Sequence, residues 1–269
     1  MALLKVSGLT KNFGGLCAVS NVNMEINEQE LIGLIGPNGA GKTTLFNLLT
    51  GVYEPSEGKI ELNVDGAMKE IGGMKPYAVT RMGLARTFQN IRLFKNLTAL
   101  DNVKIAMHKN IKYGTLQAIL RTPNYYREEE RVEQQAEELL KVVHLYDKRN
   151  ELASNLPYGE QRRLEIARAL ATQPKVLFLD EPAAGMNPQE TADLTRLIHQ
   201  IKDDFHLTVI LIEHDMSLVM TICERIYVLD YGKCIANGVP EVIKNDKRVI
   251  KAYLGEDRKS TRLNSSHCG

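Results

Sequence analysis

The sequence predicts an α/β fold with a mixed β core, an antiparallel β subdomain and a helical lobe. Three observations lead to this prediction. Apolar runs of strand length at 31–35, 175–179 and 208–213 alternate with helical patterns, which indicates a parallel sheet. Earlier strand-like runs are separated by turn residues, as in antiparallel pairs. Between about residues 90 and 155 the hydrophobic period becomes helical.

The elements follow from local patterns along the chain. Short apolar runs bounded by turn residues predict strands at 3–8, 18–26, 31–35, 59–62, 175–179, 208–213 and 225–230. The clearest helix is expected at 126–145, because its apolar residues recur on one face with charges between them. Those residues are Val132, Ala136, Leu139, Leu140 and Val143. Further helices are expected to begin near Thr44 and to cover 162–171.

Composition limits the class of protein. The chain has 269 residues, of which 43% are hydrophobic and 25% charged, enough for a sizeable core in one large domain or two lobes. Its formal net charge is +1 with both signs interspersed, so we expect no nucleic-acid partner. The start lacks the basic segment of a signal peptide, and the apolar runs are far below the roughly 20 residues that span a bilayer. A role at a membrane would therefore require a partner.

Four cysteines lie far apart and form no CxxC pair: Cys17, Cys223, Cys234 and Cys268. This usage favours free thiols in a reducing compartment over a disulfide framework or a zinc site.

One stretch is typical of a phosphate-binding loop. Residues 36–43 match G-x-x-x-x-G-K-[ST] and follow the apolar run 31–35. The glycines let backbone N–H groups surround a phosphate, Lys42 supplies positive charge, and the Thr43 hydroxyl can bind Mg²⁺. The helix that follows directs its N-terminus at the anion. The predicted ATP-binding residues here are Gly36, Pro37, Asn38, Gly39, Ala40, Gly41, Lys42, Thr43 and Thr44.

A second stretch places two acidic residues at the end of a predicted strand. The apolar run 176–179 ends in Asp180 and Glu181, the pattern of a Walker B segment. Asp180 can hold Mg²⁺, and Glu181 can accept a proton from the attacking water. We therefore predict Asp180 as a metal ligand and Glu181 as the catalytic base.

Further landmarks in the same order give a resemblance to the ATP-binding subunits of ABC transporters, over nearly all of residues 3–255. Phe13 stands where this family stacks an aromatic ring on adenine. Gln89 resembles the Q-loop glutamine that contacts Mg²⁺ and water, and His214 resembles the switch histidine at the γ-phosphate. Residues 184–188 are similar to the family's D-loop. The resemblance implies ATP and Mg²⁺ as cofactors, catalytic roles for Gln89 and His214, and a helical lobe at about 90–170.

The family's signature segment is altered. The usual Leu-Ser-Gly-Gly-Gln is replaced by residues 156–160, Leu-Pro-Tyr-Gly-Glu, so the serine hydroxyl and one glycine are missing. Gly159 remains, and we expect it before a helix that starts at 162, where N–H groups can meet a phosphate. Tyr158, Gly159 and Glu160 are therefore expected to contact the nucleotide held by a second ATPase subunit.

Within the family, the sequence is similar to the branch that serves branched-chain amino-acid importers, and there to the longer ATP-binding subunits. The similarity lies in the segments around Gln89, 158–168 and 181–188, in the opening Phe-Gly-Gly-Leu, and in the end at 250–256. It implies a complex with a second ATPase subunit, two transmembrane permeases and, indirectly, a periplasmic binding protein. It also implies a peripheral position on the cytoplasmic face of the inner membrane, where the chain powers import of leucine, isoleucine and valine.

Several alternatives remain open at this point. An importer of urea or short-chain amides differs only in what its permease carries, and an ATPase subunit does not touch the substrate. A lipopolysaccharide-export ATPase is expected to have a shorter helical insertion. A non-transport ABC protein would need two fused ATPase cores or a long coiled coil, and this chain has one phosphate-binding loop.

The end of the chain, 257–269, is polar and aperiodic and resembles a cloning or sequencing scar or an ordinary unstructured tail. His267 and Cys268 are adjacent there, but two ligands without others do not predict a metal site. We assign this tail no function.

Overall fold

The computed structural model describes residues 2–110, 117 and 119–254. The chain divides into two compact units. The first combines the residues up to Met82 with those from His206 onward, and the second covers Gly83–Phe205. Each unit has its own strands and helices and is described in turn.

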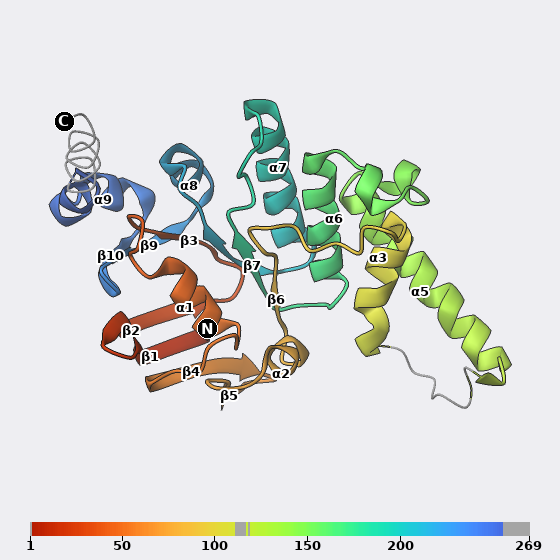
Figure 1. The fold of residues 1–269 in the computed structure, drawn as a ribbon, viewed down its shortest axis with the longest axis horizontal. Helices are drawn as coiled ribbons and strands as arrows, with labels where there is room; N and C mark the ends of the chain where they lie inside the picture. Colours follow the sequence, from red (N-terminus) through yellow and green to blue (C-terminus); the bar gives the residue numbers. More distant parts are fainter. Residues whose placement is uncertain (1, 111–116, 118, 255–269) are drawn as a thin grey trace, which may run out of the picture. The chain divides into compact units, whose positions relative to one another are not determined.

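The first unit contains an antiparallel sheet with strand order β2-β1-β4-β5 (Figure 1). Its strands are β1 (Ala2–Phe13), β2 (Leu16–Asn27), β4 (Glu57–Val64) and β5 (Ala67–Glu70). Leu4, Val6 and Leu9 of β1 are buried while Lys5 is exposed, so the strand turns its apolar face inward. This sheet confirms the predicted antiparallel subdomain.

The same unit contains a second set of strands in which β3 is central. β3 (Leu31–Ile35) pairs in parallel with both β8 (Thr208–Ile212) and β9 (Arg225–Asp230), and β9 pairs in antiparallel fashion with β10 (Lys233–Gly238). All residues of β3 and β8 are buried, as expected for a parallel sheet covered on both faces. The helices are α1 (Lys42–Leu49), α2 (Pro76–Arg81), α8 (Met216–Ile222) and α9 (Pro240–Asn245).

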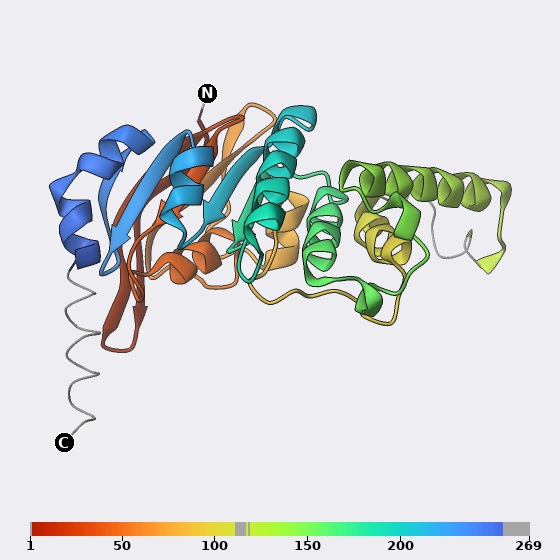
Figure 2. The ribbon, with the colours of Figure 1, turned by 90° about the horizontal axis from the view of Figure 1, so that it is seen from above.

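The second unit combines a pair of parallel strands with a group of helices. The strands are β6 (Leu84–Arg86) and β7 (Val176–Asp180), and every residue of β7 is buried. The α-helices are α3 (Ala99–Ala106), α5 (Pro123–Val142), α6 (Tyr158–Leu170) and α7 (Pro188–Asp204). Short 3₁₀ turns lie at η1 (Met107–Asn110), η2 (Tyr146–Lys148) and η3 (Ala153–Asn155). Helices α3, α5 and α6 pack against one another, as Figure 2 shows in yellow and green.

The fold confirms the predicted class and corrects some boundaries. The strands predicted at 31–35 and 225–230 have the expected bounds, and α5 covers most of the helix predicted at 126–145. The helix predicted at 162–171 begins at Tyr158 instead, because Pro157 adopts the extended backbone of an N-cap residue. Strands β5, β6 and β10 were not predicted. Cys17, Cys223 and Cys234 are free thiols, whereas Cys268 and the 257–269 tail lie outside the described residues.

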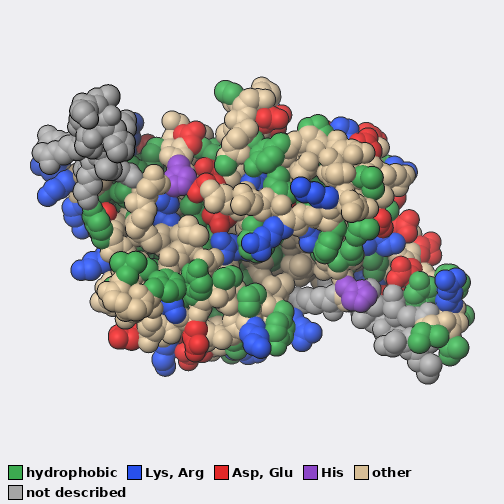
Figure 3. All heavy atoms as spheres, in the orientation of Figure 1, with side chains coloured by type: hydrophobic (Ala, Val, Ile, Leu, Met, Phe, Trp, Pro, Cys, Tyr) green, Lys and Arg blue, Asp and Glu red, His purple; other side chains and the backbone are tan. Residues whose placement is uncertain are grey.

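No helix among the described residues is both long and apolar enough to cross a bilayer. On the face drawn in Figure 3, basic and acidic side chains lie interspersed, in keeping with the small net charge.

Candidate functional site

The first unit brings the phosphate-binding loop and His214 to the same edge of its parallel strands. Leu34 of β3 lies opposite Ile212 of β8, so both strands end at the same level. Gly36 follows β3 directly, and His214 comes two residues after the end of β8. The carboxyl edge of a parallel sheet is where such folds bind ligands. His214 is exposed there, directly before Asp215, which caps α8 by accepting from the N–H groups of Ser217 and Leu218.

The loop contains glycine at two positions where it passes close to neighbouring backbone. A Cβ on Gly36 would lie 2.1 Å from the carbonyl oxygen of Leu229, and one on Gly41 would lie 2.6 Å from that of Ala18. Gly41 also has a φ of 99°, in the region that favours glycine. Gly36 and Gly41 are therefore needed where the loop passes close to the backbone of Leu229 and Ala18.

Lys42 and the start of α1 form a positively polarised site. The Lys42 ammonium is buried and donates to the carbonyls of Gly36 (2.6 Å) and Pro37 (3.0 Å), so it points back into the loop. Helix α1 starts from Gly41 with no side-chain cap and no acidic residue in its first turn. Uncapped N–H groups and the helix dipole favour an anion. These residues fit a phosphate group, and the exposed Thr43 hydroxyl lies at the start of the same helix.

Phe13 is a surface residue and no part of the core. It ends β1 with 41% of its surface exposed, and its ring meets that of Tyr53 edge-on at 5.2 Å between centroids. Lys11 Nζ lies 5.1 Å from the same ring centroid. An exposed aromatic ring of this kind can stack on a base, and Tyr53 is a neighbour that the sequence did not indicate.

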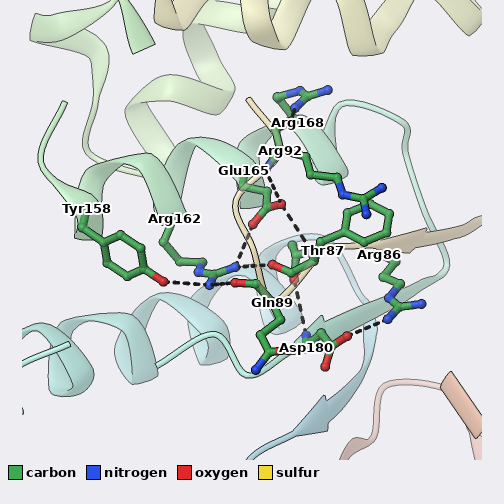
Figure 4. A network of polar contacts seen from close by, with 10 residues as sticks. Arg86, Thr87, Gln89, Arg92, Tyr158, Arg162, Glu165, Arg168 and Asp180 are labelled. Carbon is green, nitrogen blue, oxygen red and sulfur yellow. Dashed lines mark hydrogen bonds and ion pairs between the residues drawn. The ribbon is translucent and has the colours of Figure 1, made fainter. Parts of the chain in front are cut away.

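In the second unit, β6 and β7 place a carboxylate beside a guanidinium. Arg86, the last residue of β6, lies opposite Phe178 in the parallel pairing, and β7 continues for two more residues to Asp180. Asp180, the last residue of β7, is buried and accepts from Arg86 Nη2 at 2.6 Å (Figure 4). Its backbone N–H donates to the Thr87 hydroxyl at 3.4 Å. The predicted metal ligand is therefore held by a charge-assisted hydrogen bond, which fixes the orientation of its carboxylate.

The candidate base lies directly beyond this point. Gln89 Nε2 donates to Glu181 Oε2 at 2.6 Å, which joins two predicted catalytic residues that are 92 positions apart. Glu181 has a φ of 48°, in the left-handed region that is unfavourable for most residues other than glycine and asparagine. Such strain is frequent at functional sites, because the surrounding structure must impose it.

The signature segment differs from expectation in where its helix begins. Gly159 lies in the first turn of α6, one residue after its start, and does not precede the helix. Tyr158 is 45% exposed. Glu160 is bound by Lys148 Nζ, which lies 2.8 Å from both carboxylate oxygens, and Arg163 approaches it at 3.8 Å. Its hydrogen bond to Glu160 raises the pKa of Lys148.

Gly159 faces the start of α7 within the same unit. A Cβ built on Gly159 would lie 3.2 Å from Glu190 Oε1. Glu190 also closes a capping box, since its side chain accepts from the N–H of Asn187 while Asn187 accepts from the N–H of Glu190. Gly159, Glu160 and Glu190 line a cavity of about 280 Å³. The signature segment and the D-loop therefore share one surface in this unit.

The predicted residues thus form two groups. The first unit holds the phosphate-binding loop, Phe13 and His214, and the second holds Gln89, Asp180, Glu181 and the signature residues. Residues that the sequence did not single out also take part, namely Arg86, Lys148, Arg162 and Glu165. Arg162 and Glu165 are three positions apart on α6, a spacing that allows an ion pair but does not indicate that the pair is buried. The contacts of Arg86 and Lys148 depend on tertiary packing.

Comparisons with known proteins bear on both groups. A family model described as "ABC transporter" matches residues 19–184, which include the phosphate-binding loop, the Gln89 segment, the signature and Asp180–Glu181. A second model, described as "Branched-chain amino acid ATP-binding cassette transporter", matches residues 233–259.

Two curated relatives and one crystal structure are similar over nearly the whole chain. The high-affinity branched-chain amino acid transport ATP-binding protein LivG of Escherichia coli strain K12 is 49% identical over 94% of this chain and 98% of its own. The lipopolysaccharide export system ATP-binding protein LptB of the same strain is 35% identical over 96% of this chain and 99% of its own. The ADP conformation of an ATP-binding cassette of an ABC transporter gives a TM-score of 0.80 at 29% identity, covering 95% and 99%.

Proposed function

Because the chain belongs to the family of ABC transporter ATP-binding subunits, we propose that it powers import of leucine, isoleucine and valine by hydrolysing ATP. The observation that carries the proposal is the difference between two relatives. Identity reaches 49% with an ATP-binding protein of branched-chain amino acid transport but only 35% with one of lipopolysaccharide export, although both relatives match nearly the whole chain. The match of residues 233–259 to a branched-chain family model supports the same substrate class.

In this proposal the first unit binds the nucleotide. Phe13 stacks on adenine, the backbone of 36–41 surrounds the phosphates, and Lys42 turns from the loop carbonyls to the β- and γ-phosphates. His214 contacts the γ-phosphate from the end of β8. These contacts bind and orient ATP. The residues that act on the attacking water belong to the second unit.

The residues proposed for Mg²⁺ supply hard oxygen ligands, which this ion prefers. They are the Thr43 hydroxyl, the Asp180 carboxylate and the Gln89 side-chain oxygen. Mg²⁺ bound with ATP neutralises charge that develops on the phosphate oxygens. Arg86 keeps the Asp180 carboxylate oriented through its 2.6 Å hydrogen bond.

Hydrolysis is assigned to the second unit. Glu181 accepts the proton of the attacking water, and Gln89, which lies against Glu181, helps to place that water. Tyr158, Gly159 and Glu160 meet the nucleotide of a second ATPase subunit through the first turn of α6. Two permease subunits move with the closing and opening of the pair, a periplasmic binding protein delivers the substrate, and the chain works at the cytoplasmic face of the inner membrane.

The proposal is tested by co-purifying the chain with its permease subunits and reconstituting the complex in liposomes. The expected result is ATP-dependent leucine uptake, with competition by isoleucine and valine but not by urea. Uptake of urea or a short-chain amide in place of leucine would assign the chain to a different importer. Co-purification with lipopolysaccharide-transport subunits would contradict import altogether.

A further inference from the structure

Helix α6 contains a buried ion pair that the reaction described above does not use. The Arg162 side chain is completely buried, and its Nη1 lies 2.8 Å from Oε2 of Glu165, which is 5% exposed. Burial raises the pKa of Glu165, while the Arg162 charge and two backbone N–H groups act in the opposite direction. Moving two charges out of water is costly, and apolar residues of similar size often serve stability as well. Stability alone therefore does not explain why this pair is buried.

The pair holds the backbone of the Gln89 segment. Arg162 donates to the carbonyls of Phe88 (2.6 Å) and Gln89 (2.8 Å), and Glu165 Oε1 accepts from the N–H groups of Phe88 (3.3 Å) and Arg92 (3.4 Å) (Figure 4). Residues 88–92 belong to no helix or strand, so they lack a backbone ladder of their own. Two side chains of one helix supply four of the hydrogen bonds that fix this loop.

Arg162 and Glu165 together form a clamp on the Gln89 segment. The clamp connects the candidate catalytic residues to the signature segment. At the catalytic residues, the Gln89 side chain donates to Glu181 at 2.6 Å, so fixing the Gln89 backbone sets how far its amide reaches. At the signature segment, Arg162 Nη2 also donates to the Tyr158 hydroxyl at 3.1 Å. The contacts Tyr158–Arg162–Gln89–Glu181 form a continuous path, and all four residues lie in the second unit.

We propose that Arg162 is a positioning residue for hydrolysis, which ties the signature residue Tyr158 to Gln89 and sets the position of Gln89 relative to Glu181. The proposal rests on the function proposed above, in which Tyr158 meets the nucleotide of a second subunit. Contact at Tyr158 then changes the place of Gln89 beside the base of the same chain. Glu165 is the second half of the clamp, because it holds the amides on either side of Gln89.

The first test is a double-mutant cycle in the full chain, comparing Arg162→Lys, Gln89→Ala and the two combined. Lysine keeps the charge but cannot donate to both carbonyls in the planar geometry of arginine. We expect Arg162→Lys to lower kcat about tenfold, since a small displacement of a positioning group is costly. ATP affinity should stay unchanged, because the phosphate-binding loop is in the first unit. The double variant should be no slower than Gln89→Ala alone.

If the double variant lost kcat by the product of the two single losses, Arg162 would act independently of Gln89, and the proposal would be overturned. An unchanged kcat in Arg162→Lys would overturn it as well. Arg131→Lys is the matched control, because Arg131 pairs with Glu128 within α5, a helix that contains none of the four residues of the path. Its kcat should equal that of the wild type.

If Arg162→Lys fails to fold, Tyr158→Phe decides the question, since it removes only the hydroxyl that Arg162 binds. We expect a two- to fivefold loss of kcat, of the order of one hydrogen bond, and no loss in the Gln89→Ala background. If Tyr158→Phe lowered kcat equally with and without Gln89→Ala, Tyr158 would not act through Gln89, and the proposal would be refuted.

A readout without ATP separates this proposal from the transport function. Amide hydrogen exchange at Phe88 and Arg92 should rise in Glu165→Met, which has a similar length but no oxygen to accept from these N–H groups, and should remain unchanged at the phosphate-binding loop. This result is expected whether or not the complex carries leucine. Unchanged protection of both amides would show that Glu165 does not hold the loop.

Discussion

The phosphate-binding loop and the Gln89–Glu181 region are built in opposite ways. The loop uses the backbone of consecutive residues, with one buried lysine turned onto the loop's own carbonyls. The Gln89–Glu181 region uses side chains, and the hydrogen bonds that join it link residues 92 to 94 positions apart. The residues of the loop are contiguous in the sequence, so a local motif identifies them. The side-chain cluster forms only when β6, β7 and α6 pack together. Substitutions should therefore affect binding through the first region and hydrolysis through the second.

The largest effect on binding is expected from Lys42→Ala. Removing the ammonium leaves several phosphate charges without a buried counter-charge, so ATP affinity should fall by at least about 100-fold. Calorimetric titration with Mg–ATP measures this, with Lys5→Ala as a control, because Lys5 is an exposed lysine on β1 of the same unit. Wild-type ATP affinity in Lys42→Ala would show that the Lys42 ammonium does not bind the nucleotide, and it would contradict the assignment of binding to this loop.

Gly159→Asp should spare binding and stop hydrolysis. The new carboxylate would stand where a phosphate of the second subunit approaches, at a cost of several kcal/mol if poorly solvated. ATP affinity of the isolated chain should be normal, while the ATPase rate of the assembled complex falls by about two orders of magnitude.

The structure provides the control for this variant. The Cβ of residue 159 would lie 3.2 Å from Glu190 Oε1, so Gly159→Asp also creates repulsion within one chain. Adding Glu190→Gln relieves the local repulsion and leaves the charge at the subunit interface. Recovery of the ATPase rate in the double variant would show that Gly159 acts locally and makes no contact across the interface.

A smaller effect is expected at the altered signature. Glu160 carries a negative charge where the family has glutamine, and Lys148 binds both of its oxygens. Lys148→Ala should lower the ATPase rate of the complex about two- to fivefold, as expected for a partly exposed ion pair. The loss should shrink in high salt. Adding Glu160→Gln should restore the rate, because no uncompensated charge remains; a double variant as slow as Lys148→Ala would disprove this explanation.

The smallest effect is expected from Pro157→Ser. Residue 157 is the N-cap of α6 with φ −54° and ψ 156°, values that serine adopts readily, and no side chain caps this helix in the protein. Serine can accept an N–H bond of the first turn, so stability should rise by at most about 1 kcal/mol. The ATPase rate should be unchanged. Thermal unfolding and a rate measurement check both, and a lost rate would assign the proline ring a role of its own.

The same comparison explains what could be predicted from sequence. Strand β3, the loop and α1 were predictable because an apolar run, glycines and Lys42 follow one another directly. Strand β5 was not, because all four of its residues are exposed and show no apolar period. Strand β6 has only three residues, too few for any pattern.

The clamp formed by Arg162 and Glu165 could not be predicted from the sequence either. Arg162 and Glu165 have the spacing of ordinary polar residues on an exposed helix, and only the packed structure shows them turned inward. Arg86 likewise meets Asp180 through the parallel pairing of β6 and β7. The positions of Asp180 and Glu181 could be predicted from the end of an apolar strand, but the cations and amides that orient them could not.

The most direct test of the division between binding and hydrolysis is a single-turnover experiment on Glu181→Gln with radiolabelled ATP and Mg²⁺. The amide keeps the shape of the side chain but cannot accept the proton of the attacking water. The variant should bind ATP with wild-type affinity and return it on quenching as ATP, with hydrolysis slowed by roughly 10²- to 10⁴-fold. Release of ADP at the wild-type rate would remove Glu181 from catalysis, and loss of ATP binding would contradict the separation of the two regions.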